Sequence, residues 1–518
     1  MNNDEQAAQS EQDGSTSYDI PLPDGLRKAI AENWEPAPRM PHPANRDGVT
    51  SSGAASFARN RAALSARLPR ELIVVPAGVL KVRANDTEYP FRASSAFTWL
   101  TGETVEGAVL VMVPSGPTSQ AATGTATHTA PGSHQATLYV REYSGAGEVG
   151  YFTNRMFGAL WVGNVPTVSE TQSVLDIRVR PLSELASDLR GAPGHPVLSF
   201  PGVDATVDAL LPGTTGSTRN AKLAEAIDEL RLTKDDWEVS QLQLACDATA
   251  RGFADVVAEL PAVLAGGGKR GERWLEGSFW RRARMEGNEV GYTSIVGAGQ
   301  HATTLHWWRN DGDIAPGQLL LADMGVEVDS LFTADVTRTL PVSGEWTPVQ
   351  RQLYSAVLEA QEAGIAEVKA GADFLAAHKA AMWVLADHLH SWGILPVSAA
   401  VSCAEDVEAP GAGLHRRYTL HGVSHMLGID VHDCAAARDE TYRNGALGSG
   451  YVLTVEPGLY FQPNDLSVPA EWRGIGIRIE DDILVTDGAA RNLSGALPRE
   501  PEDVIEWMRD AQSRPATP

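Results

Sequence analysis

The chain has 518 residues, which is too long for one ordinary domain. Of these residues 43% are hydrophobic and 21% are charged, a composition typical of globular proteins. Its net charge of −24 argues against nucleic acid and anionic membranes as partners, because a polyanion would be repelled. The three cysteines (Cys246, Cys403 and Cys434) are odd in number and widely spaced, which excludes a disulfide framework and a cysteine-rich zinc module.

The N-terminal segment is polar and weakly periodic. Its first residues lack the apolar stretch of a signal peptide, and no window of the chain approaches the ~18 apolar residues of a membrane span. We therefore expect a cytoplasmic protein with no membrane partner. Residues 1–50 are rich in proline and polar residues, which is typical of a flexible tail or a surface arm.

Residues 51–230 are predicted to form a first, smaller α/β domain. A helical pattern begins near Phe57, and two apolar runs, Leu72–Pro76 and Ala108–Pro114, have the length and the flanking turn residues of buried strands. We expect Gln135–Glu142 to pair with the second of these strands. The segment 114–134 is rich in Ser, Thr, Gly and Pro and is predicted to be a long surface loop. No catalytic constellation is visible in this domain.

Residues 231–495 are predicted to form the second domain, and 496–518 a C-terminal tail that starts with a short helix. Thr233 and Asp236 resemble a helix N-terminal cap, and Pro348 suits the first position of a later helix. Among the helical patterns lie four strand-like runs, Gln318–Gly325, Thr333–Thr339, Tyr451–Phe461 and Gly474–Val485. Because helices and strands mix without a strict βαβ rhythm, the predicted fold class is α+β.

Three motifs suggest familiar chemistry but lack a required residue. The glycine-rich AGGGKRGER has no Ser or Thr after Lys269 and follows a helix rather than a strand, unlike a phosphate-binding loop. HGVSHMLG does not match the G-x-S-x-G of serine hydrolases. His421 and His425 have the spacing of H-E-x-x-H, but Gly422 occupies the place of its catalytic glutamate.

Four acidic residues lie in or beside the apolar strand-like runs, where a carboxylate is costly to bury: Asp323, Asp335, Glu456 and Glu480. A single acid of this kind is usually paired with a cation, but four brought together would repel one another unless metal ions were bound. With one imidazole from HGVSHMLGIDVHD, the ligand set is mostly oxygen. That set favours Mn²⁺, with Co²⁺ or Zn²⁺ as substitutes.

Five segments carry a family resemblance: YTSIVGAGQHATTLHW, LLLADMGVEVDSLFTADVTRTLPV, HGVSHMLGIDVHD, LTVEPGLYF and RGIGIRIEDDILVT. In this order they resemble the pita-bread metallopeptidases, and most closely the aminopeptidase P (Xaa-Pro aminopeptidase) family. The resemblance implies a C-terminal pita-bread catalytic domain preceded by a creatinase-like N-terminal domain. It also implies small peptides with proline in the second position as substrates and a homo-oligomer, either a dimer or a tetramer.

The resemblance also assigns roles position by position. It implies two divalent metal ions bound by Asp323, Asp335, His425, Glu456 and Glu480, with Asp335 and Glu480 bridging. It implies Glu456, His421, His432 and Arg478 as catalytic residues, and His306, Tyr460 and His421 as substrate-binding residues. A hydroxide between the ions would attack the X-Pro bond, Glu456 would relay the proton, and the histidines would stabilise the oxyanion.

Several alternatives stay open at this stage. A prolidase, which cleaves X-Pro dipeptides, would use the same ligands, although Ser424 stands where prolidases tend to carry glycine. A methionine aminopeptidase would share the metal site but normally lacks so large a first domain. A non-catalytic binding protein or a metal-free creatinase-like enzyme would be expected to have lost ligands. Arg478 could also serve only as the counter-charge of Glu480.

Overall fold

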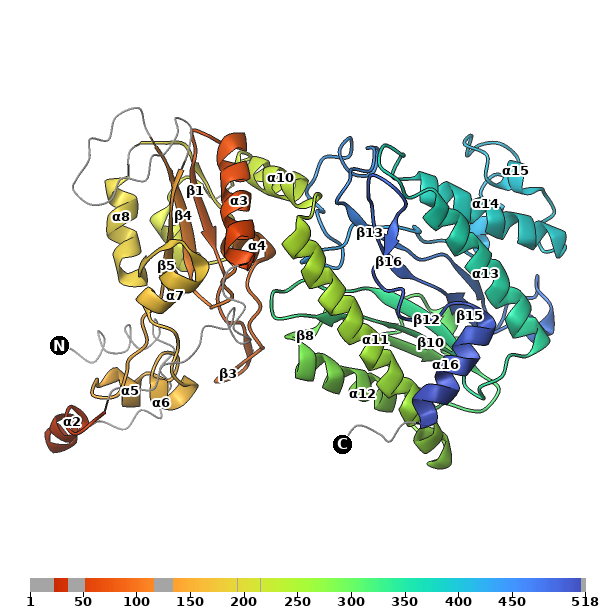
Figure 1. Cartoon of the computed structure of the whole chain (residues 1–518), viewed down its shortest axis with the longest axis horizontal. Coiled ribbons are helices and arrows are strands. Elements are labelled where there is room, and N and C mark those ends of the chain that lie inside the picture. The colour runs from red at the N-terminus through yellow and green to blue at the C-terminus, as the bar shows by residue number, and fades with distance from the viewer. Residues whose placement is uncertain (1–22, 36–51, 116–133, 193, 215, 514–518) are drawn as a thin grey trace. The chain divides into compact units, whose positions relative to one another are not determined.

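The computed structural model describes residues 23–35, 52–115, 134–192, 194–214 and 216–513 (Figure 1). The chain divides into two compact units, Met1–Ala226 and Ile227–Pro518. Most of the predicted tail 1–50 and of the predicted loop 114–134 lies outside the described residues, although α2 (Asp24–Ile30) falls within the first of these segments. Within the described ranges, none of the helices combines the length and the apolar character needed to span a bilayer.

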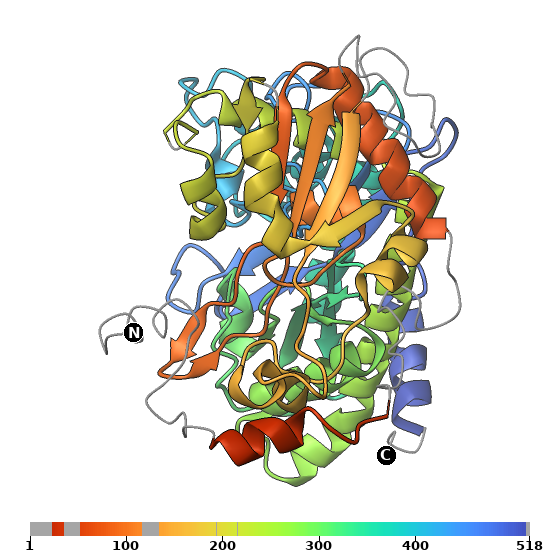
Figure 2. The same cartoon turned by 90° about the vertical axis from the view of Figure 1, so that its left-hand side faces the viewer.

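A five-stranded sheet forms the centre of the first unit, in the order β6-β5-β4-β1-β7 (Figure 2). Its strands are β1 (Leu72–Pro76), β4 (Val109–Pro114), β5 (His134–Val140), β6 (Arg178–Pro181) and β7 (Val197–Leu198). The central strands β1, β4 and β5 pair antiparallel, and the two edge strands join in parallel. The three predicted strands and the pairing of the second with the third are therefore confirmed.

Short helices and one small hairpin complete this unit. The helices are α3 (Ser52–Arg67), α4 (Ser95–Thr101), α5 (Gly150–Thr153), α6 (Ala159–Val162), α7 (Val168–Leu175), α8 (Leu185–Gly191) and α9 (Ala205–Leu210), and the hairpin is β2 (Val82–Ala84) with β3 (Thr87–Glu88). The helix α10 (Asn220–Arg231) crosses the boundary between the two units in the sequence. Apolar side chains from both faces of the sheet are buried, which is consistent with an α/β arrangement.

The second unit contains α11 (Asp236–Ala265), α12 (Gly271–Glu286), α13 (Pro348–Ala366), α14 (Ala376–Ser391), α15 (Ala399–Ser402) and α16 (Pro501–Ser513). The predicted cap at Thr233 is wrong: Asp235 caps α11, because its side chain accepts hydrogen bonds from the backbone N–H groups of Trp237 and Glu238. Pro348 does occupy the first turn of α13, after the cap Thr347. In Figure 1, α11 lies beside α12 and α16, and α13 beside α14.

The strands of this unit are β8 (Glu289–Val290), β9 (Ile295–Ala298), β10 (Leu319–Met324), β11 (Val326–Glu327), β12 (Val336–Pro341), β13 (Val452–Val455), β14 (Gly458–Phe461), β15 (Ile475–Arg478), β16 (Asp481–Leu484) and β17 (Arg491–Asn492). They form the antiparallel sheets β12-β10-β9 and β13-β16-β17 and the pairs β14-β15 and β11-β8. Helices therefore surround several small antiparallel sheets, as the predicted α+β class requires.

Two predicted strands are each broken in the structure. The run 451–461 divides into β13 and β14, and the run 474–485 divides into β15 and β16, with the halves in different sheets. Pro457 explains the first break, because proline has no N–H to continue the ladder. At the second break the backbone N–H of Glu480 donates to the carbonyl of Thr337. Thr337 belongs to β12, which is part of neither the sheet that contains β15 nor the sheet that contains β16. Both glutamates therefore lie at bends rather than within strands.

Candidate metal centre and active site

A cavity of about 910 Å³ in the second unit collects the polar residues singled out in the sequence. All of the predicted site residues except Tyr460 line it, namely His306, Asp323, Asp335, His421, His425, His432, Glu456, Arg478 and Glu480. Tyr460 lies directly behind, hydrogen-bonded to two of them. A set spread over more than 170 positions of the sequence thus faces one cavity.

The local folding of each segment explains this convergence. Asp323 belongs to β10 and Asp335 directly precedes β12, its antiparallel partner, so both carboxylates arrive at the same end of one sheet. Glu456 comes directly after β13, and Glu480 lies between β15 and β16, directly before Asp481. His425 lies in an irregular segment, and its backbone N–H donates to the Thr454 hydroxyl at 3.2 Å.

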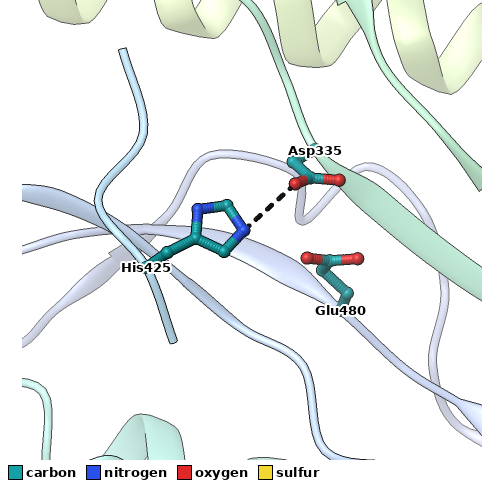
Figure 3. A group of neighbouring side chains, drawn as sticks. All are labelled: Asp335, His425 and Glu480. Atoms are coloured by element: carbon teal, nitrogen blue, oxygen red, sulfur yellow. Dashed lines mark ion pairs between the residues drawn. The ribbon is translucent and has the colours of Figure 1, made fainter. Parts of the chain in front are cut away.

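Three of the five predicted ligands already have the spacing of a metal site. Single ligand atoms of Asp335, His425 and Glu480 lie within 4.8 Å of one another, and their side chains point toward one another from three separate segments (Figure 3). His425 Nε2 lies 3.3 Å from Asp335 Oδ2 and 3.5 Å from Glu456 Oε1. His425 Nδ1 donates to the Met426 carbonyl at 3.1 Å, which leaves Nε2 free to act as a ligand.

The electrostatics of the cluster favour a bound cation. Burial raises the pKa of Glu456 to about 8, and burial together with the charges of Asp335 and Glu456 holds the pKa of Glu480 well above its usual range. Burial alone would lower the pKa of His425, but the surrounding carboxylates raise it to about 9. The protein alone therefore holds protons at this cluster, and divalent cations would displace them. Oxygen donors with a single imidazole fit such cations.

The fifth predicted ligand, Asp323, is held in place by two side-chain hydrogen bonds. Its Oδ2 accepts a hydrogen bond from Arg478 at 2.5 Å, and its Oδ1 accepts one from the Tyr292 hydroxyl at 2.6 Å. Burial raises the pKa of Asp323, whereas Arg478 opposes that rise. Arg478 consequently forms an ion pair with Asp323, and its charge also acts on Glu480, to which the Thr337 hydroxyl links it.

A chain of hydrogen bonds links this arginine to His421. Arg478 donates to the Tyr460 hydroxyl at 3.1 Å, and that hydroxyl lies 2.8 Å from His421 Nε2. His421 Nδ1 is 2.8 Å from the Gly422 carbonyl and can only donate to it. Burial and Arg478 lower the pKa of His421 to about 4, so the ring is a neutral hydrogen-bonding group at physiological pH.

The remaining two predicted histidines are less constrained. His432 is exposed, and its ring stands edge-on to His425 with centroids 4.5 Å apart. A buried ion cluster anchors the residue that follows it: Asp433 accepts hydrogen bonds from Arg231 and from Lys234, the latter at 3.0 Å. His306 is also exposed and lines the cavity. His432 is thus brought next to a predicted ligand, and His306 lines the same cavity.

Some residues at the site were missed in the sequence. The Thr337 hydroxyl donates to Glu480 Oε2 at 2.6 Å and accepts from Arg478 Nε at 3.0 Å. Asp482 Oδ2 accepts the backbone N–H of Asp335 at 3.1 Å. Tyr292, the donor to Asp323, stands first in the motif YTSIVGAG, and that position was the only available signal. These residues contact the site because their strands or loops lie beside other strands in the fold, and a local sequence motif does not show which segments lie side by side.

Comparisons with known proteins agree with this geometry. Residues 240–487 match the model of metallopeptidase family M24, and residues 57–195 match the aminopeptidase P N-terminal domain. Xaa-Pro aminopeptidase 1 of Streptomyces coelicolor is 49% identical over 457 residues, which cover 88% of this chain and 87% of that protein. Escherichia coli Xaa-Pro aminopeptidase is 29% identical over 88% of this chain and 98% of that protein.

A solved structure shows the same fold across nearly the whole chain. Zinc-substituted E. coli aminopeptidase P, solved in complex with product, superposes with a TM-score of 0.74 at 28% identity and covers 89% of this chain and 99% of that one. The predicted pita-bread architecture with an aminopeptidase P-type first domain is therefore confirmed. A divalent metal ion is implied by the family, and the enzyme is a metal-dependent exopeptidase. The chain belongs to the Xaa-Pro aminopeptidases of metallopeptidase family M24.

Proposed function

We propose that this protein removes the N-terminal residue from peptides whose second residue is proline. In this proposal two divalent ions, Mn²⁺ in preference to Co²⁺ or Zn²⁺, would be held by Asp323, Asp335, His425, Glu456 and Glu480, all of which line the cavity. The observation that carries it is the grouping of Asp335, His425 and Glu480 within 4.8 Å, in a cavity that Asp323 and Glu456 also line.

The ions, when bound, would lower the pKa of a coordinated water and polarise the scissile carbonyl. Glu456 is proposed to accept the water's proton and to return it to the leaving imino nitrogen; its buried carboxylate, 3.5 Å from His425 Nε2, supports this role. Neutral His421, with His432 nearby, would hydrogen-bond the carbonyl oxygen as it gains charge. Asp323 offers a negative charge to the substrate's free amine.

An X-Pro bond is a tertiary amide whose nitrogen carries no hydrogen, so the enzyme needs no hydrogen-bond acceptor facing the nitrogen of the bond that is cleaved. His306 and Tyr460 are proposed to contact the substrate, His306 as an exposed group on the cavity rim and Tyr460 through its hydroxyl near His421. Arg478 is proposed to fix Tyr460 and Asp323 relative to each other.

The wider organisation follows the same reasoning. We propose that residues 51–230 form the creatinase-like domain and residues 231–495 the catalytic domain, which the matched ranges 57–195 and 240–487 support. Within the last segment, 496–518, α16 packs against α11 with Val504 and Met508 buried. We also propose a cytoplasmic dimer or tetramer.

The test uses metal-stripped protein to which Mn²⁺ is restored, with an X-Pro dipeptide, an X-Pro-Y tripeptide and an X-Ala-Y control as substrates. Metal-dependent release of X from the tripeptide, lost in Glu456→Ala, supports the proposal. Cleavage confined to the dipeptide would identify a prolidase instead. If no peptide with proline in the second position is cleaved while metal is bound, the proposal fails.

A further inference from the structure

A single buried carboxylate holds four groups of one loop. Glu272, the second residue of α12, has a fully buried side chain, and both of its oxygens accept hydrogen bonds. Oε1 accepts the backbone N–H of Ala298 at 2.8 Å and lies 2.7 Å from His301 Nδ1. Oε2 accepts the indole N–H of Trp307 at 2.8 Å and the backbone N–H of Gly312 at 2.6 Å.

The charge of this carboxylate depends on those four donors. Among the described residues the one ion-pair partner of Glu272 is His301, and no Lys or Arg side chain of that set pairs with it. A buried carboxylate is costly unless hydrogen bonds satisfy its oxygens, and because it only accepts, His301 Nδ1 donates to it. The packing is close, since a Cβ atom on Gly312 would lie 2.7 Å from the carboxyl carbon of Glu272. The loop is therefore fixed to the start of α12 by a charge that its own N–H groups satisfy.

The loop that Glu272 holds, residues 298–312, forms part of the wall of the metal-centre cavity. His306 and Trp308 both line that cavity. Trp307, which stands between them in the chain, does not line it and bonds to Glu272 instead. The carboxylate therefore holds the residue that joins two members of the cavity wall.

The imidazole of His306 takes its position from the backbone around it. The residue is exposed, and its ring makes no hydrogen bond to any part of the chain that the structure describes. On one side of it the Thr303 carbonyl accepts from Gln462 Nε2 at 2.9 Å, and on the other side Glu272 holds Trp307. Misplacing a substrate-positioning group by about 1 Å can slow a reaction by up to about 100-fold. Loss of the Glu272 contacts would free one of these two anchors.

Resting on the proposed function, in which His306 contacts the substrate, we infer that Glu272 is a positioning residue for the reaction. Its carboxylate keeps Trp307 in place, and through the backbone it keeps the imidazole of His306 on the cavity wall. Glu272 does not itself line the cavity, so it acts only through the loop. A carboxylate that served stability alone would affect catalysis independently of His306, and this difference can be measured.

The experiment is a double-mutant cycle that measures kcat/KM of the Mn²⁺-loaded full chain for Ala-Pro-Ala. The variants are Glu272→Gln, His306→Ala and the two together. Glutamine keeps the size of the side chain, but its amide nitrogen cannot accept from the two N–H groups that face it. The matched control is Glu238→Gln, because Glu238 is also buried and glutamine can replace its capping bond to the Asp235 N–H. Elemental analysis counts the metal in each variant, and mass spectrometry follows amide hydrogen exchange of the loop.

We expect His306→Ala to lower kcat/KM by about 100-fold and Glu272→Gln by about 10-fold, with the Mn²⁺ content unchanged. The double variant should be no slower than His306→Ala, because an imidazole that is absent cannot also be misplaced. Hydrogen exchange of residues 298–312 should become faster in Glu272→Gln and not in Glu238→Gln. Trp307→Phe removes one of the four donors but keeps an aromatic ring, so it should show a smaller loss that also vanishes in the His306→Ala background. This variant decides the question if Glu272→Gln does not fold.

Losses that multiply in the double variant would overturn the inference, as would wild-type activity in Glu272→Gln or in His306→Ala, or an equal loss in Glu238→Gln. Failure of the wild type to cleave any X-Pro peptide would instead refute the proposed function. In that case the hydrogen exchange still tests the structural step: faster exchange in Glu272→Gln would retain Glu272 as the anchor of the loop, and unchanged exchange would overturn that step as well.

Discussion

Thr337 offers the most direct structural test of how the metal centre is held. Its hydroxyl is fully buried, donates to Glu480 Oε2 at 2.6 Å and accepts from Arg478 Nε at 3.0 Å. Replacement with valine keeps the shape of the side chain but removes both hydrogen bonds. Two residues further along β12, the hydroxyl of Thr339 is equally buried but bonds only to backbone atoms of Arg478, so Thr339→Val is a matched control.

A hydrogen bond to a charged group contributes about 1.5–3 kcal/mol, so the two lost bonds should destabilise the metal-loaded protein by about 3–6 kcal/mol. Loss of a residue that orients a ligand typically weakens metal binding by about 10–100-fold. Thr339→Val should lose some stability but keep its metal affinity, and Thr337→Ser should restore most of the affinity.

The assay is competition for Mn²⁺ with a chelator of known affinity, run alongside thermal unfolding of each variant with and without metal. The reasoning is refuted if Thr337→Val binds Mn²⁺ as tightly as the wild type, or if Thr339→Val loses the same affinity. The first result would mean that Glu480 is oriented without Thr337, and the second that any cavity in β12 disturbs the site.

Two further predictions concern charge. In the folded metal-free protein the pKa of Glu456 is about 8, well above the ~4.3 of an unfolded chain, so between pH 5 and 7 the folded state binds a proton that the unfolded state has lost. This group should therefore lower the free energy of unfolding by about 1.4 kcal/mol for each pH unit of increase in that range. Urea titrations should show this slope in the metal-free protein and not in the metal-loaded protein. Asp433→Asn should destabilise the protein by about 3–5 kcal/mol in chemical denaturation, since Arg231 and Lys234 would remain buried with one charge removed; unchanged stability would show that the ion cluster is dispensable.

The sequence predicted much of the secondary structure because its signals are local. β1 was found from an apolar run between turn residues, and α13 from a proline in its first turn. The broken strands were missed for a physical reason: periodicity shows which residues alternate but not where a strand changes partners. Only the fold reveals that Glu456 and Glu480 lie where the chain leaves one sheet for another.

In the site, too, the ligands could be predicted from the sequence, whereas the contacts that support them could not. Unpaired acids in apolar surroundings pointed to Asp323, Asp335, Glu456 and Glu480, and family resemblance pointed to His425 among the histidines. The supporting contacts of Thr337, Tyr292 and Asp482 depend on strand register, which single-residue patterns do not encode. The pairing of Arg478 with Asp323 likewise required β10 and β15 to be placed side by side.

The central claim is that five residues hold two divalent ions that X-Pro hydrolysis requires. Its most direct test is titration of metal-stripped protein with Mn²⁺, with bound metal counted by elemental analysis and Ala-Pro-Ala cleavage measured at each step. The account predicts two ions per chain in the wild type, activity that rises with their binding, and reduced stoichiometry in Asp335→Asn. Full cleavage by metal-free protein, or two ions bound in Asp335→Asn as tightly as in the wild type, would contradict it.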